Sequence, residues 1–257
     1  MNSTQIHKKL FVGFNWKMNP NTMEQAQKLF QVYDNLNSNK QNFSPVVFVP
    51  SLYVNSIQAI NSSKVSIGSQ DISDQPSGAF TGQISGQMLH SLDVKYSLVN
   101  HSETHRDHKL DFQNITNKFT QALQNDIIPI MCVSFDSLEK AKYDLENQLQ
   151  NIFTLDLIKL IKLQNLTFYI ALEPILNIGS GKALVCIEID KYLLVIKNCI
   201  NKLGLNKSTN FSLLYGGSVN SSNIIEIGKC QLVDGFLLGG ASIDTNQVKQ
   251  IFEKLSS

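Results

Sequence analysis

The feature of this chain that most constrains its fold is the repeated alternation of short apolar runs with longer segments of helical periodicity. Most of the runs are almost continuously apolar, which is typical of parallel strands that are covered on both faces. The predicted strands span residues 10–16, 46–50, 65–69, 96–100, 127–133, 168–173, 211–216 and 234–238.

The segments between these runs carry helical patterns. Within 23–36, apolar residues recur with a period near 3.6, at Met23, Ala26, Leu29, Phe30 and Tyr33. The same kind of pattern predicts further helices over residues 112–123, 138–149, 187–203 and 248–255.

Strand-then-helix units repeated along 257 residues predict an α/β fold, a single-domain, eight-stranded parallel (β/α)8 TIM barrel over 1–257. The alternative is an open doubly wound sheet, but that fold usually carries a GxGxxG turn after its first strand, and this sequence has none there. Hydrophobic residues make up 42% of the chain and charged residues 17%, a balance that favours a folded core over disorder.

The charge, the apolar pattern and the cysteines of the chain indicate which partners and which cellular compartment to expect. The formal net charge is +1 with no basic stripe, so nucleic acid is not an expected partner. We also expect no membrane span and no signal peptide, hence a cytoplasmic protein. Cys132, Cys186, Cys199 and Cys230 are widely spaced without a CxxC pair, so we expect reduced, mostly buried thiols and no metal site.

Polar residues stand where several predicted strands end, which in a barrel is where chemistry gathers. Asn15 and Lys17 are two residues apart at the end of the first strand and therefore share a face. His101 and Glu103 follow the fourth strand, and Glu173 closes the sixth.

These residue types suit the removal of a proton next to a carbonyl group. Glu173 is a candidate general base, with a solvated loop carboxylate as the alternative. His101 is a candidate electrophile that stabilises the oxyanion, with a structural buried histidine as the alternative. A lysine such as Lys17 does not by itself indicate a functional site, since most lysines are solvated surface charges. Asn15 on the same face of the strand supports a functional role for it.

Glycines cluster at three strand ends and suggest a phosphate site, because their backbone N–H groups can approach a ligand closely. Ordinary turn glycines are the alternative for any one of them. The clusters contain Gly179, Gly181, Gly216, Gly217, Gly239 and Gly240. The GSGK at 179–182 is not a P-loop, because Leu176 occupies the earlier glycine position and Ala183 follows the lysine.

Six motifs, in matching order and spacing, resemble one protein family. They are FVGFNWKMN at 11–19, GAFTGQIS at 78–85, NHSET at 100–104, ALEPILNIGSGKA at 171–183, LLYGGSVN at 213–220 and DGFLLGGAS at 234–242. The family is the triosephosphate isomerases, and the similarity runs nearly end to end.

The resemblance implies the interconversion of dihydroxyacetone phosphate and glyceraldehyde 3-phosphate, with no cofactor and no metal. Glu173 would move a proton between two carbons through an enediolate, and His101 would act as the neutral electrophile. Lys17 would supply positive charge and Asn15 a hydrogen bond, and Glu103 matches the acid that follows the family's histidine. The implied phosphate ligands are backbone N–H groups near Gly179, Ser218, Gly239 and Gly240, under a hinged lid over 174–182.

The resemblance also implies a homodimer formed through the loop 77–83. Gln83 in this loop stands for a family glutamate, and Thr104 after His101–Glu103 stands for a family arginine, so an ion pair near the dimer interface is replaced by two neutral residues. Phe135 and Leu176 likewise replace a glutamate and a lid tryptophan that form a polar contact, so any direct contact between them must be apolar.

The chain departs from the family pattern at three further positions. Phe14 and Asn100 replace family glycines, and Asp71 replaces an asparagine. On strand alternation Phe14 should point away from Asn15 and Lys17, into the layer between barrel and helices.

Two other functions stay open from the residues alone. One is a non-catalytic barrel that serves as a binding protein, although degenerate copies usually lose the base or the lysine. The other is an isomerase of another small phosphosugar. The short lid IGSGK favours a three-carbon substrate by analogy.

Overall fold

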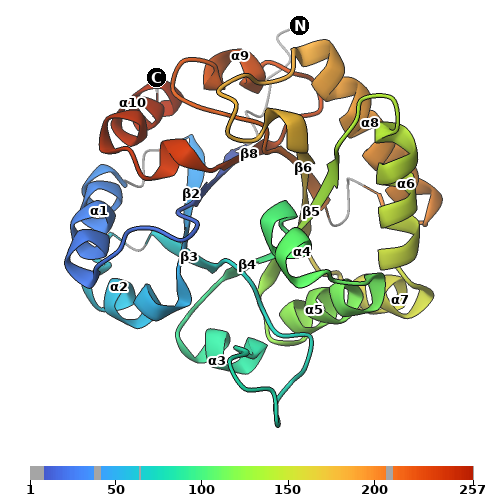
Figure 1. The fold of residues 1–257 in the computed structure, drawn as a ribbon, viewed down its shortest axis with the longest axis horizontal. Coiled ribbons are helices and arrows are strands. Elements are labelled where there is room, and N and C mark those ends of the chain that lie inside the picture. Colours follow the sequence, from blue (N-terminus) through green and yellow to red (C-terminus); the bar gives the residue numbers. More distant parts are fainter. Residues whose placement is uncertain (1–8, 38–41, 64, 207–210, 257) are drawn as a thin grey trace, which may run out of the picture.

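The computed structural model describes residues 9–37, 42–63, 65–206 and 211–256, and its centre is a closed barrel of parallel strands in chain order. β1 pairs with β2 on one side and with β8 on the other, which closes the sheet (Figure 1). The predicted (β/α)8 barrel is therefore confirmed and the open sheet was the wrong alternative. The strands are β1 (Leu10–Asn15), β2 (Phe43–Val49), β3 (Ser66–Ser69), β4 (Tyr96–Val99), β5 (Ile128–Phe135), β6 (Phe168–Pro174), β7 (Phe211–Tyr215) and β8 (Gly235–Leu238).

Helices form a ring outside the strands, while the short α4 lies over the end of the barrel that faces the reader in Figure 1. The helices are α1 (Met23–Leu36), α2 (Val54–Ile60), α3 (Gly86–Ser91), α4 (Ser102–His108), α5 (Phe112–Gln124), α6 (Ala141–Ile152), α7 (Leu155–Gln164), α8 (Cys186–Lys202), α9 (Ile224–Gly228) and α10 (Thr245–Ser256). Short 3-10 turns cover Ser51–Tyr53, Ile175–Asn177 and Gly240–Ser242.

The helix predicted over 23–36 has those bounds, and it begins where the Thr22 hydroxyl accepts a hydrogen bond from the N–H of Gln25. The helix predicted over 138–149 is displaced, because α6 begins only at Ala141. Helices α2, α3, α4, α7 and α9 were not predicted. Four of them have seven residues or fewer, too few for a helical period to emerge from the sequence.

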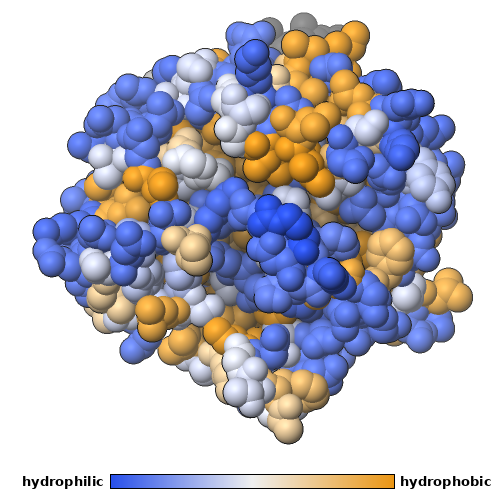
Figure 2. Space-filling view, viewed as in Figure 1, coloured by the Kyte–Doolittle hydropathy of each residue, from blue (hydrophilic) through white to orange (hydrophobic). Residues whose placement is uncertain are grey.

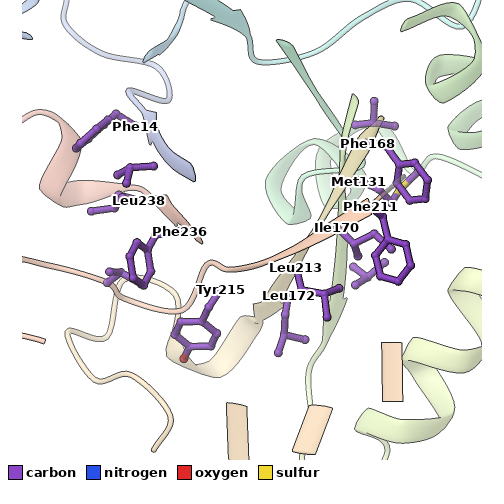
Figure 3. Packing of buried hydrophobic residues seen from close by; sticks show 14 of the residues in the cluster. Phe14, Met131, Phe168, Ile170, Leu172, Phe211, Leu213, Tyr215, Phe236 and Leu238 are labelled. Atoms are coloured by element: carbon purple, nitrogen blue, oxygen red, sulfur yellow. The ribbon is translucent and has the colours of Figure 1, made fainter. Parts of the chain in front are cut away.

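Buried apolar side chains form two layers, one inside the barrel and one between the barrel and its helices. Phe14 belongs to the outer layer, where its ring centroid lies 5.0 Å from that of Tyr33 and 5.8 Å from that of Phe252. Figure 3 shows the same layer, with Phe168 and Phe211 next to each other. The outward direction expected for Phe14 is confirmed. The interior cluster contains Phe11, Val46, Phe48, Leu98, Ile130, Cys132, Ala171, Leu214 and Leu237.

The interior of the barrel is filled at one level by the ring of Phe48. A Cβ atom on Gly68 would lie 2.3 Å from that ring, so β3 needs a glycine at this position for the two strands to pack. This close approach supports a packed core beneath the mouth of the barrel.

The cysteines correct one expectation from the sequence. Cys132 and Cys199 are free and buried, but Cys186 and Cys230 form a disulfide with a Cα–Cα distance of 5.3 Å. The prediction of four reduced thiols was therefore wrong for this pair. The pairing depends on the fold, which brings the start of α8 beside the turn after α9 although 44 residues separate them.

Candidate active site

The predicted residues gather at the carboxyl ends of the strands, around one cavity of about 230 Å³. Glu103 lies beside it, in a neighbouring depression that Asn15, Lys17 and His101 also line. In Figure 2 the surface over the barrel mouth is largely polar, with an apolar group over the segment after β6, where Ile175 and Leu176 are exposed. The predicted residues that line the cavity are Asn15, Lys17, His101, Glu173, Gly179, Gly181, Gly216, Ser218, Gly239 and Gly240.

Glu173 lies near the end of β6 and is only 2% exposed, so its carboxylate is removed from bulk water. Its Oε1 is 3.1 Å from Nε2 of His101, and its Oε2 accepts a hydrogen bond of 2.9 Å from the backbone N–H of Ser102. Each carboxylate oxygen therefore has a nitrogen atom within 3.1 Å. The surface-loop alternative for this residue does not hold.

His101 precedes α4 and caps it, because its Nδ1 accepts a 3.3 Å hydrogen bond from the backbone N–H of Glu103. An imidazole nitrogen that accepts carries no proton, so the hydrogen of a neutral ring must be on Nε2. This nitrogen is the one that lies 3.1 Å from Oε1 of Glu173. The arrangement places a neutral N–H donor beside a carboxylate.

Lys17 stands just after β1 with a positive φ of 55°, a backbone conformation that is uncommon outside glycine. Two contacts hold it there: its N–H donates to Oδ1 of Asn15 at 2.9 Å, and its carbonyl accepts from Nε2 of Gln70 at 2.8 Å. Its ammonium group lies 2.5 Å from Oε1 of Glu103. A ligand anion would compete with Glu103 for this charge.

Asn100 also has a positive φ, of 63°, a conformation that asparagine adopts more readily than most residues other than glycine. Its side chain connects two elements around His101. The Nδ2 donates to the carbonyl of Cys132 in β5 at 3.0 Å, and the Oδ1 lies 3.0 Å from Nδ1 of His105 in α4.

The glycine-rich strand ends face the cavity from the opposite side. The 3-10 turn Gly240–Ser242 follows β8 directly, and the first N–H groups of such a turn have no partner within it. Gly179 and Ser218 both have positive φ, of 71° and 52°. The Ser218 hydroxyl donates to the carbonyl of Asn177, which ties the segment after β7 to the lid.

In the segment 174–182, the predicted lid, Leu176 is 65% exposed. Phe135 is buried, with its ring centroid 4.8 Å from that of Tyr192 in α8. In this conformation Phe135 therefore belongs to the packing of α8, and most of the Leu176 surface faces solvent.

Burial and the neighbouring Glu173 raise the pKa of the Cys132 thiol well above its ordinary value. The thiol stays protonated and is no nucleophile. Burial likewise raises the pKa of Tyr215 to about 12, so its hydroxyl is neutral when it accepts the N–H of Leu184 at 2.9 Å.

Two residues of the site were not predicted from the sequence. Gln70 follows β3 and donates to the Lys17 carbonyl. It could have been predicted, because it is a polar residue directly after a barrel strand, where site residues gather. Ser102 acts through its backbone N–H, for which the sequence carries no signal.

Within the described residues, no group of three or more His, Cys, Asp or Glu side chains is placed to hold a metal ion. Among the helices that the structure describes, none is long and apolar enough to cross a membrane.

A closed parallel barrel with a buried carboxylate, a neutral imidazole and a lysine at its strand ends defines the class of barrel enzymes that transfer protons. Residues 10–255 match the model of the triosephosphate isomerase family. A triosephosphate isomerase of Mesomycoplasma hyopneumoniae strain 232 is 34% identical over 251 residues, covering 95% of this chain and 98% of that protein. One of Blochmanniella floridana is 30% identical over 258 residues, covering 97% of each chain. The chain belongs to the triosephosphate isomerase family and is an isomerase.

Proposed function

We propose that this isomerase interconverts dihydroxyacetone phosphate and D-glyceraldehyde 3-phosphate by proton transfer through an enediolate. The observation that carries the proposal is the 3.1 Å pairing of Glu173 with the Nε2 of His101 in a cavity that Lys17 also lines. Such a reaction needs a base, an oxyanion donor and a positive charge, and these three side chains supply them.

Glu173 acts as the base that takes the proton from C1 of the ketone and returns it to C2. His101 donates from Nε2 to the substrate oxygen that becomes negative. Because the Glu173 carboxylate lies 3.1 Å from this nitrogen, the substrate oxygen must take the place of the carboxylate beside His101. Released from this contact, Glu173 can reach the carbon-bound proton.

Lys17 and Asn15 complete the polar wall of the site. The Lys17 ammonium stabilises negative charge on the substrate, and the Asn15 amide nitrogen donates a hydrogen bond. Glu103 keeps Lys17 in place through their 2.5 Å ion pair until substrate arrives. The phosphate is held by backbone N–H groups near Gly179, Ser218, Gly239 and Gly240, which all line the cavity.

The proposal includes a homodimer formed through the loop 77–83 and a place in the cytoplasm. All residues of this loop are exposed in the single chain, with Phe80 at 46%. In Figure 1 the segment between β3 and α3 projects from the rim of the barrel, as a loop that reaches a partner would.

A coupled assay that follows glyceraldehyde 3-phosphate formed from dihydroxyacetone phosphate tests the function. We expect rapid turnover with this substrate and none with five- or six-carbon sugar phosphates. Turnover only with a longer phosphosugar would support the second candidate substrate class. Binding of the triose phosphate without turnover would support a binding protein and contradict the proposal.

A further inference from the structure

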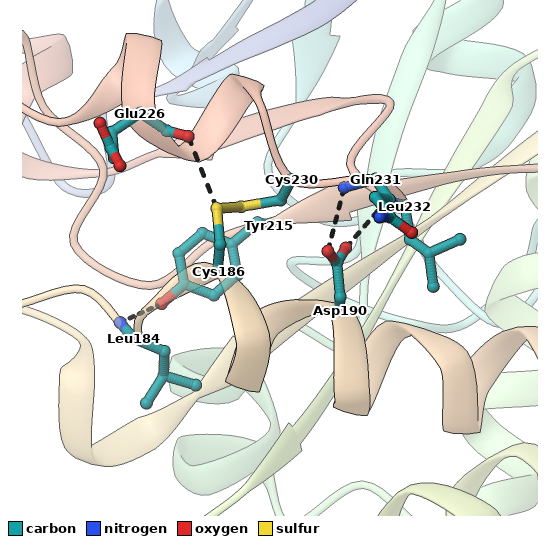
Figure 4. Close-up of a disulfide and its surroundings, with 8 residues drawn as sticks. All are labelled: Leu184, Cys186, Asp190, Tyr215, Glu226, Cys230, Gln231 and Leu232. Atoms are coloured by element: carbon teal, nitrogen blue, oxygen red, sulfur yellow. Dashed lines mark hydrogen bonds between the residues drawn. A yellow bond between two sulfur atoms is a disulfide. The ribbon is translucent and has the colours of Figure 1, made fainter.

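The carboxyl-terminal end of the lid is fastened to the barrel immediately before α8. The N–H of Leu184 donates to the Tyr215 hydroxyl on β7 at 2.9 Å, and α8 begins two residues later at Cys186 (Figure 4). The conformation of the first turn of α8 therefore limits how far this end of the lid can move.

The disulfide holds that first turn from outside. It joins Cys186, the first residue of α8, to Cys230, two residues after the end of α9. The covalent bond thus connects the segment that carries the lid to the segment that leads into β8.

A second contact holds the same two segments one helical turn further along. The Asp190 carboxylate accepts hydrogen bonds from the backbone N–H groups of Gln231 at 3.0 Å and Leu232 at 2.9 Å. Because this clamp does not depend on sulfur, cleavage of the disulfide frees the first turn of α8 and leaves the rest attached. The effect of cleavage is then local to the lid.

The two cysteines of the disulfide differ in exposure. Cys230 is only 5% exposed, whereas Cys186 is partly exposed and lies between Val185 and Ile187, which are exposed. An incoming thiolate therefore reaches the Cys186 sulfur first and expels the more buried Cys230 sulfur.

We propose that Cys186–Cys230 is a thiol-exchange site, modified by small dithiols, that sets the mobility of the lid. The dithiol's thiolate attacks Sγ of Cys186 and forms a mixed disulfide, and the Cys230 thiolate leaves and takes a proton from water. The second thiol of the dithiol then displaces the Cys186 thiolate, which is also protonated. In total the protein disulfide gains two electrons and two protons, and the dithiol becomes a cyclic disulfide.

Reduction makes lid closure less favourable, because a freed turn must be ordered again each time the lid closes. We expect KM for the triose phosphate to rise by about five- to thirtyfold, since fixing the backbone of one residue costs about 1–2 kcal/mol. Turnover at saturating substrate should change less than twofold.

The test compares the intact protein as purified in air with the same protein treated with dithiothreitol and desalted without oxygen. Of the four cysteines, two are paired, so thiol counts in denaturant should be two before and four after treatment. Hydrogen exchange at Leu184 should accelerate on reduction, while exchange in β7 stays unchanged. These readouts do not need activity, so they separate a failure here from a failure of the proposed isomerase function, on which only the KM measurement rests.

The Cys186→Ser/Cys230→Ser variant should have the KM and the Leu184 exchange rate of the reduced protein, and dithiothreitol should change neither. Cys199→Ser is the matched control, because it removes a free buried thiol and should keep the full response. If the double variant does not fold, chemical reduction of the native protein alone decides. Unchanged KM and unchanged exchange at Leu184 after full reduction would overturn the proposal, as would four free thiols in the air-purified protein.

Discussion

The Oε1 atom of Glu173 lies 3.1 Å from Nε2 of His101, while Oε2 of the same carboxylate accepts from the N–H of Ser102. The base and the electrophile of the proposed reaction thus hold each other before substrate binds. His101 caps the start of α4 and Ser102 is its first residue, so one short helix positions both side chains of the proposed reaction.

The backbone N–H of Ser102 should be needed to place Glu173. Ser102→Pro removes this donor at the first residue of α4, where a helix tolerates proline, and the extended ψ of 139° at His101 suits a following proline. A hydrogen bond to a charged group contributes about 1.5–3 kcal/mol, so we expect kcat/KM to fall about tenfold or more. Ser102→Ala keeps the N–H and should be nearly unchanged. Equal kinetics in both variants would contradict the role of this contact.

Asn100 should stabilise the protein through its side chain while tolerating a left-handed backbone. Asn100→Gly loses the hydrogen bonds to the Cys132 carbonyl and His105 but keeps an easy positive φ. Asn100→Ala loses the same bonds and adds strain, so it should be about 1 kcal/mol less stable than the glycine variant. Urea unfolding at one protein concentration measures the difference, and an alanine variant as stable as the glycine variant refutes the strain argument.

Asp71, which replaces an asparagine of the family pattern, forms an ion pair with the buried Lys118. Both carboxylate oxygens lie 2.7 Å from Nζ of Lys118, whose side chain is 5% exposed against 37% for Asp71. Asp71→Asn leaves the lysine without its counter-charge, and we expect a loss of about 1–3 kcal/mol in the free energy of unfolding, moderated by the exposure of Asp71. Combining it with Lys118→Met should cost clearly less than the sum of the single changes. Strict additivity in this double-mutant cycle would show that the pair does not act as a unit.

The proposed dimer should resist salt better than a dimer held by an interface ion pair. Gln83 and Thr104 carry no charge, so screening has little to weaken between them. Sedimentation velocity should give the same dimer fraction at low and high salt. Dissociation driven mainly by salt, or a fully active monomer, would count against the assembly.

The barrel could be predicted from the sequence because most of its strands are apolar runs that polar residues or glycines separate from the helices. The sequence also placed Phe14 correctly, since strand alternation alone decides which layer a side chain enters. Helices such as α3 and α9 were not predicted, because so few residues show no helical periodicity. Such short helices are stabilised by packing against the barrel.

Within the site, side chains were easier to predict than backbone groups. Glu173 and His101 stand out by residue type and position, whereas the N–H of Ser102 has no residue-specific signature. The disulfide between Cys186 and Cys230 could not be predicted either, because only the closed barrel brings α8 beside the turn after α9.

The central claim is that Glu173 is the base of a triose phosphate isomerisation. Glu173→Gln keeps the size of the side chain and its ability to accept from Ser102, but removes the charge that accepts the proton. The coupled assay with dihydroxyacetone phosphate should show a turnover at least about 10²-fold below that of the unmodified protein, with little change in unfolding free energy. Glu139→Gln, which makes the same change at an exposed residue, should keep full turnover. Turnover in Glu173→Gln close to that of Glu139→Gln would contradict the account.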